Sequence, residues 1–213
     1  MTAQPTLRRR AEKNPVPSLI ISVLGMAGIL ALKFFVLDLY LIEMALLLVV
    51  VGFCAIGCTQ DIIRGLVSLA MLYIASGVAA AFYRAIAPFV GAPFGGGVNY
   101  DILALSFGLL TVVLWGALEI IGRVTFRDTS IPALGILDNL GSLLIYLLTG
   151  VLAASLLFNT IGYGYWGYRA HDKASLRPAF NRVLYLHYTA QSFLFPRGLP
   201  PIYTYDLDAP REH

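Results

Sequence analysis

Residues 138–159 read DNLGSLLIYLLTGVLAASLLFN, and this stretch decides the fold. After Asp138 it holds no charged residue, and it is long enough to cross the hydrocarbon core of a bilayer, which takes about 20 mainly apolar residues in a helix. It lacks the alternation of polar and apolar residues that is typical of a barrel strand. Because backbone polar groups in lipid must be satisfied within the segment, the stretch is predicted to be a transmembrane helix.

Four further windows have the same character, at about residues 17–36, 39–57, 65–86 and 102–122. Of the 213 residues in the chain, 58% are hydrophobic and 13% are charged, against about 25% charged residues in an ordinary soluble domain. The sequence therefore predicts an all-α, polytopic integral membrane bundle of about five transmembrane helices. The first window could instead be a signal peptide with Arg8 to Lys13 as its basic region. We favour retention, because the apolar run is long and carries Lys33 near its end.

Lys and Arg residues near the helix ends predict the orientation, since cytoplasmic loops carry an excess of them. With a cytoplasmic N-terminus, the short outside loops hold little more than Lys33 and Arg84. The inside then collects Arg8, Arg9, Arg10, Lys13, Arg64, Arg123 and Arg127. We expect a basic cytoplasmic segment over residues 1–16, a bundle over 17–160 and an extracytoplasmic tail over 161–213. The expected location is the cytoplasmic (inner) membrane of a bacterium.

The tail contains an amphipathic pattern at about residues 175–193. Its apolar residues fall three and four apart, which places them on one helical face; they are Leu176, Phe180, Val183, Leu184 and Tyr188. Polar residues, namely Arg177, Asn181, Arg182 and Gln191, take much of the remaining surface. The pattern favours a helix that lies on the membrane or on the bundle. It could also dock a partner.

Two charged residues near the first turn between windows are candidates for function, because burying a charge in a membrane is costly. Lys33 and Glu43 lie at equal distances from Asp38, so a tight hairpin would place them at similar depth. We expect an ion pair that fixes the hairpin, with a proton or ion relay as the alternative. Glu119 and Arg123 are four apart, with the acid first, and predict a stabilising pair on one helix.

No set of residues points to catalysis, a metal or a cofactor. Cys54 and Cys58 share a helix face, but a metal site needs more ligands, and the histidines, His171, His187 and His213, all lie in the tail. Ser155 and Asp138 sit on one membrane helix, apart from those histidines. We expect no enzyme activity, no cofactor and no nucleic-acid partner.

Small residues recur at four-residue spacing, as in Gly77 with Ala81 and Gly150 with Ala154. Such faces let helix backbones approach closely in lipid. They predict tight packing within the bundle or between subunits.

Two stretches resemble the colicin V production (CvpA-like) membrane proteins. GFCAIGCTQDIIRGLVSLAMLYIASGVAAAFY, residues 52–83, resembles the N-terminal half of that family, and LGILDNLGSLLIYLLTGVLAASLLF, residues 134–158, resembles its second signature. Residues 175–178, SLRP, look like the start of the family's amphipathic segment. The likeness covers about residues 41–195. The family typically spans the membrane four times, so residues 1–38 look like an added helix, and Glu43 does not map onto a family position.

The resemblance implies a non-catalytic role in secretion or envelope homeostasis. The residues that match the family pattern are Arg64, Gly65, Asp138, Gly141 and Gly150. The resemblance suggests that Arg64 and Asp138 meet as a charged clamp, with Asp138 also capping its own helix. The alternative is an accessory structural subunit of a larger membrane complex, such as a photosynthetic or respiratory assembly. The expected partners are lipid and either a second copy of the chain or that complex.

Overall fold

The computed structural model describes residues 16–35, 39–95, 97–125, 135–164, 171–196 and 198–204, and the ordered elements within these ranges are all helical. Five helices form the bundle: α1 (Val16–Phe35), α2 (Leu41–Gly57), α3 (Ile62–Gly91), α4 (Tyr100–Thr125) and α5 (Gly135–Tyr163). A short helix, η1 (Ala92–Phe94), directly follows α3. After α5 come α7 (Arg177–Gln191) and η2 (Ser192–Leu194). Helix α8 (Pro201–Thr204) comes last.

Four segments are long and apolar enough to cross a membrane. They are Val16–Phe35, Ile62–Phe94, Tyr100–Thr125 and Asp138–Tyr163. Helix α2 is apolar but has only 17 residues, which corresponds to about 26 Å at 1.5 Å per residue and falls short of an average hydrocarbon core of about 30 Å. The described part of the chain is therefore a membrane-type helix bundle with four long apolar helices and one shorter one.

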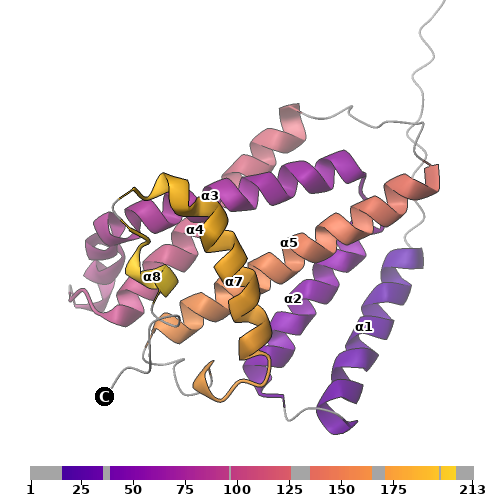
Figure 1. Ribbon diagram of the computed structural model, residues 1–213, viewed down its shortest axis with the longest axis horizontal. Coiled ribbons are helices and arrows are strands. Elements are labelled where there is room, and N and C mark those ends of the chain that lie inside the picture. Colours follow the sequence, from indigo (N-terminus) through magenta and orange to yellow (C-terminus); the bar gives the residue numbers. More distant parts are fainter. Residues whose placement is uncertain are drawn as a thin grey trace, which may run out of the picture.

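The bundle consists of two antiparallel pairs, α2 with α5 and α3 with α4, joined where α3 packs on α5. In Figure 1, α3 and α5 diverge from this junction, and α7 lies across α5 toward α3. Helix α1 stands beside α2, with only 6% of its apolar window buried.

Glycines allow the close approach of α2 and α5. A Cβ on Gly57 would lie 2.8 Å from the Cβ of Tyr146, and one on Gly150 would lie 2.8 Å from the Cβ of Phe53. Backbone contact of this kind is how helices associate in lipid, where no hydrophobic force draws them together. The Ser142 hydroxyl adds a hydrogen bond of 2.9 Å to the Gly57 carbonyl. The last turn of α2 is thereby fixed against the second turn of α5.

The main core lies where α3, α4, α5, α7 and α8 converge. Its large buried residues include Tyr83 and Phe107 from the α3/α4 pair, and Leu184, Tyr188 and Tyr203 from the tail. The rings of Tyr188 and Tyr203 stack at 3.9 Å between centroids. The tail helices therefore complete the interior of the bundle.

Candidate functional site

Asp138 joins α5 to α3. A carboxyl oxygen of Asp138 accepts a hydrogen bond of 2.9 Å from the backbone N–H of Ile62. That amide is one of the first four in α3, which have no partner within the helix. Asp138 therefore holds the start of α3, and its expected pairing with Arg64 stays a prediction. Asp138 does not cap its own helix, because α5 begins three residues earlier, at Gly135.

Glu43 joins α2 to α7. Its side chain is fully buried. One carboxyl oxygen accepts from the N–H of Tyr40 at 2.9 Å, which is half of a capping box on α2. The other accepts from the N–H of Leu176 at 2.7 Å, just ahead of α7. Lys33 is exposed, and its expected pairing with Glu43 stays a prediction.

The four glycines singled out in the sequence face neighbouring elements. A Cβ on Gly65 would lie 3.1 Å from Ile145, one on Gly141 would reach the Ile62 side chain, and one on Gly150 would lie against Phe53. Gly77 is different, since its nearest neighbours are Gln191 and Leu194 in the tail, each at 3.1 Å. Gly65, Gly141 and Gly150 thus line helix contacts of α5, and Gly77 lets the tail approach α3.

A buried polar cluster holds the tail against the middle of α3. Ser76 Oγ lies 3.0 Å from His187 Nε2, and the Gln191 amide donates to the Tyr73 carbonyl at 2.7 Å. The Tyr203 hydroxyl lies 2.8 Å from Gln191 Oε1 and 3.0 Å from the Ser76 carbonyl. All of these contacts join α7 or α8 to α3 or to each other.

This cluster corrects one expectation from the sequence, because Gln191, expected on the exposed face of the amphipathic helix, is fully buried. It also contains a serine–histidine contact between Ser76 and His187 that sequence patterns do not predict. Ser76 is fully buried and also donates to the Tyr73 carbonyl at 3.0 Å. A catalytic serine needs access to a substrate and an activating base. The Ser76 hydroxyl is instead buried and forms hydrogen bonds with groups inside the protein.

Burial lowers the pKa of His187 from 6.5 to about 4. Its surroundings are aromatic, with Tyr73, Tyr188 and Tyr203 around the ring. Because the folded pKa is below the unfolded one, the unfolded chain takes up a proton first as the pH falls. The free energy of unfolding therefore has its full value above about pH 6.5, where His187 is neutral in both states. It falls progressively between about pH 6.5 and pH 4.

We expect acidification from pH 7 to 5.5 to destabilise the docked tail by about 1 kcal/mol, from this difference in pKa. Thermal unfolding in detergent over a pH series measures the effect. His187→Gln, which cannot take up the proton, should remove most of this dependence. A wild-type pH profile identical to that of His187→Gln would contradict the assignment.

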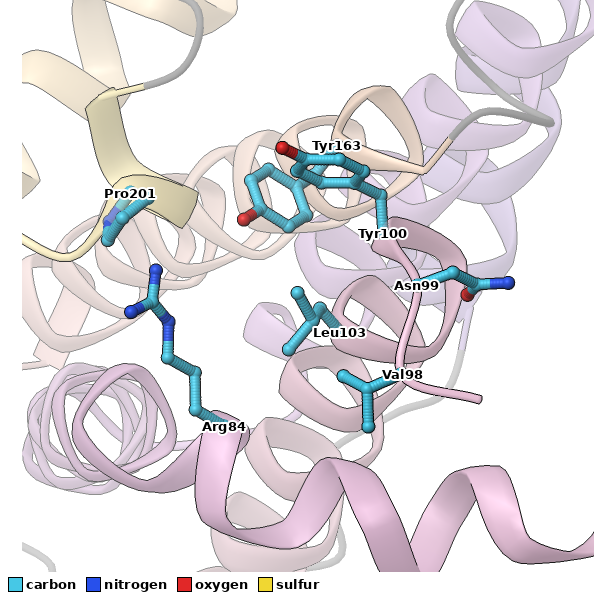
Figure 2. A pocket seen from close by; sticks show the side chains of 7 residues that line it. All are labelled: Arg84, Val98, Asn99, Tyr100, Leu103, Tyr163 and Pro201. Atoms are coloured by element: carbon cyan, nitrogen blue, oxygen red, sulfur yellow. The ribbon is translucent and has the colours of Figure 1, made fainter. Parts of the chain in front are cut away.

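An open pocket lies where α3 and α5 finish and α4 begins. It has a volume of about 630 Å³. Its lining residues are Arg84, Val98, Asn99, Tyr100, Leu103, Tyr163 and Pro201. Figure 2 shows the Arg84 guanidinium pointing into the space between Pro201 and the two tyrosines. The pocket thus combines one exposed cation with aromatic hydroxyl groups.

Local contacts hold the walls of this pocket. Arg84 Nε donates to the Tyr83 hydroxyl at 3.2 Å. Asn99 Oδ1 accepts from the N–H of Ile102 at 2.9 Å and so caps the start of α4. The rings of Tyr100 and Tyr163 meet edge to face, with centroids 5.5 Å apart. These contacts leave the guanidinium of Arg84 at the open side of the pocket.

No known protein family, curated protein or solved structure matches this chain.

The other candidate residues from the sequence lie outside these sites. Arg123 Nε lies 3.4 Å from Glu119 Oε1, which confirms the predicted pair on α4. Cys54 and Cys58, both in the described part of the chain, are not joined in a disulfide. Among the described residues, no three His, Cys, Asp or Glu side chains come together as metal ligands would. His171 packs face to face on Phe158 at 4.2 Å between centroids, and His213 lies outside the described residues.

Proposed function

We propose that this protein is a multi-pass membrane protein with a non-catalytic role in secretion or envelope homeostasis, of the kind implied by its resemblance to CvpA-like proteins. One observation carries the proposal. The residues that carry the resemblance gather at helix contacts: Asp138 holds the start of α3, and Gly141 faces Ile62. Gly65 faces Ile145. These residues hold α3 against α5, where the two helix pairs meet. Such contacts support a structural role for them rather than a catalytic one.

The proposed topology has five membrane crossings and an amphipathic tail helix, with α2 as the short crossing. The N-terminus is cytoplasmic in a bacterial inner membrane, and the end of α5, from which the tail begins, lies on the opposite side. Helix α2 connects α1 to α3 and pairs along its length with α5. Because α5 is long and apolar enough to span the membrane, its partner α2 is proposed to cross with it.

Single-cysteine reporters at residues 5 and 205 test this topology. The background carries Cys54→Ala and Cys58→Ala, which removes the native thiols. A membrane-impermeant maleimide added to intact cells should label residue 205 and leave residue 5 unlabelled until the cells are opened. Labelling of both residues from one side would mean an even number of crossings and would contradict the five-crossing topology.

The role itself is tested by envelope permeability. A strain that lacks the gene should take up more of an impermeant dye, and the wild-type gene should restore the barrier. Gly150→Leu, which would force α2 and α5 apart, should restore it poorly, while Gly116→Leu should complement, because nothing lies within 4 Å of a Cβ there. An unchanged barrier in the deletion strain would contradict an envelope role.

The accessory-subunit alternative is favoured by one feature, the exposure of α1. Large apolar side chains along α1 are exposed, among them Leu19, Val23 and Phe34. Lipid or a partner helix could cover them. Recovery of a stoichiometric complex in mild detergent that is lost when α1 is deleted would support the alternative; a homo-oligomer or single chain would support the envelope role.

A further inference from the structure

A second, apolar crevice lies between α4 and α5, one helical turn from the pocket at Arg84. The crevice has a volume of about 60 Å³. Its lining residues are Leu72, Phe107, Gly108, Thr111, Val112, Trp115, Ala153, Leu156, Leu157 and Thr160. The hydroxyls of Thr111 and Thr160 are turned to their own helices, where they donate to the carbonyls of Phe107 and Leu156. The surface presented to an occupant is therefore almost entirely hydrocarbon.

Neighbouring turns of α4 and α5 line the pocket and the crevice, and we call this line of residues the seam. On α4 the lining passes from Tyr100 and Leu103 to Phe107 and Thr111, in steps of three and four residues, and on α5 it passes from Tyr163 to Thr160. Steps of three and four keep to one side of a helix. The seam opens sideways, because Val112, which lines the crevice, is 55% exposed. An occupant could therefore enter from the surrounding lipid.

We propose that this seam binds one membrane phospholipid, with its phosphate at Arg84 and the start of an acyl chain in the crevice between α4 and α5. Arginine presents planar N–H donors that suit phosphate oxygens. Tyr100 and Tyr163 line the same mouth. The mouth lies at the ends of apolar helices, where the headgroups of a bilayer are found.

Charge and position together select this occupant. A free anion would use Arg84 but would leave the crevice empty, and an apolar molecule would use the crevice but not the cation. A phospholipid, which has both a phosphate and acyl chains, satisfies both parts of the seam. The inference depends on insertion of the bundle in a membrane and is independent of any role in secretion.

Retention of lipid by the full-length protein tests the proposal. The protein is purified in mild detergent, and bound phospholipid is counted by native mass spectrometry. Wild type should retain about one phospholipid per chain. Arg84→Gln should weaken retention about tenfold, the loss expected for a hydrogen bond to a charged group. Arg182→Gln, which removes another exposed arginine from the surface of α7, should retain as much lipid as wild type.

A second pair of variants tests the crevice. Val112→Phe places a ring in the seam, and Val113→Phe places the same ring on the adjacent lipid-facing position, which is equally exposed at 56% but does not line the crevice. Only Val112→Phe should displace the lipid. Both variants change exposed side chains, so folding should persist, and thermal unfolding checks it. Equal retention in both members of either pair would overturn the proposal.

The source of the phosphate is settled with stripped protein. Lipid-free protein is titrated with dioleoylphosphatidylglycerol in mixed micelles and, separately, with inorganic phosphate. The lipid should bind with saturation and inorganic phosphate should not compete at tenfold excess. Binding of inorganic phosphate that is unaffected by Val112→Phe would make the pocket a simple anion site and would overturn the lipid assignment.

Discussion

Glu43→Ala will destabilise the folded protein by about 2–4 kcal/mol, since each buried donor left without an acceptor costs about 1–3 kcal/mol. The variant removes the acceptor from two backbone amides at once, those of Tyr40 and Leu176. One of these begins α2 and the other precedes α7. We therefore expect a lower apparent melting temperature in detergent, together with faster proteolysis of the tail.

Lys33→Ala is the matched control, because Lys33 is the exposed residue that a hairpin ion pair with Glu43 would use. It should leave the melting temperature unchanged. Glu43→Gln keeps one acceptor oxygen and should give an intermediate loss. Equal losses from Lys33→Ala and Glu43→Ala would indicate an ion pair and contradict the account.

Asp138→Ala will destabilise the junction of α3 and α5 by about 1–2 kcal/mol, the usual cost of removing a helix cap. The lost contact is the hydrogen bond to the Ile62 amide. Asp138→Asn, which keeps an acceptor oxygen in the same place, should recover most of the stability. Thermal unfolding of the three proteins measures the difference.

Arg64 supplies the control for this second experiment. If Asp138 acts through the Ile62 amide, exchanging the charges in Arg64→Asp with Asp138→Arg will not restore stability. It places a guanidinium, which has no acceptor, against a backbone donor. Partial recovery by the exchange would show that the two side chains interact and would restore the clamp implied by the family resemblance.

The helices were predictable because long apolar runs carry their own signal. The windows at about 17–36 and 138–159 fall within or close to α1 and α5, and the three-and-four spacing of Phe180, Leu184 and Tyr188 marks the buried face of α7. These features depend on residues close together in sequence. A helix can therefore be predicted without knowledge of what it packs against.

The partners of the buried carboxyl groups were not predictable in the same way. A Lys–Glu or Arg–Asp pair is visible in a sequence because both members have distinctive side chains. A backbone amide is present at every residue except proline, so nothing marks the Leu176 amide, 133 positions from Glu43, as its partner. The sequence therefore favoured the visible cations, Lys33 and Arg64, over the helix ends that these groups hold.

The cluster at Ser76 was missed for a related reason. His187 and Gln191 are four apart and both lie on the buried side of α7, which conflicts with treating every polar residue as exposed. The polar groups that satisfy them belong to α3, more than 100 positions earlier in the chain. The position of His187 and Gln191 beside the apolar face of α7 was the one sign in the sequence that they are buried against another helix.

Amide hydrogen exchange in detergent tests most directly whether each buried carboxyl group holds a remote helix end. The account predicts that Glu43→Ala raises exchange at the start of α7, around Leu176, and leaves the start of α3 protected. Asp138→Ala should do the reverse, raising exchange at Ile62 and sparing Leu176. If both variants raised exchange equally at both helix ends, or at neither, the account would be contradicted, because each carboxyl group would then not hold its own helix end.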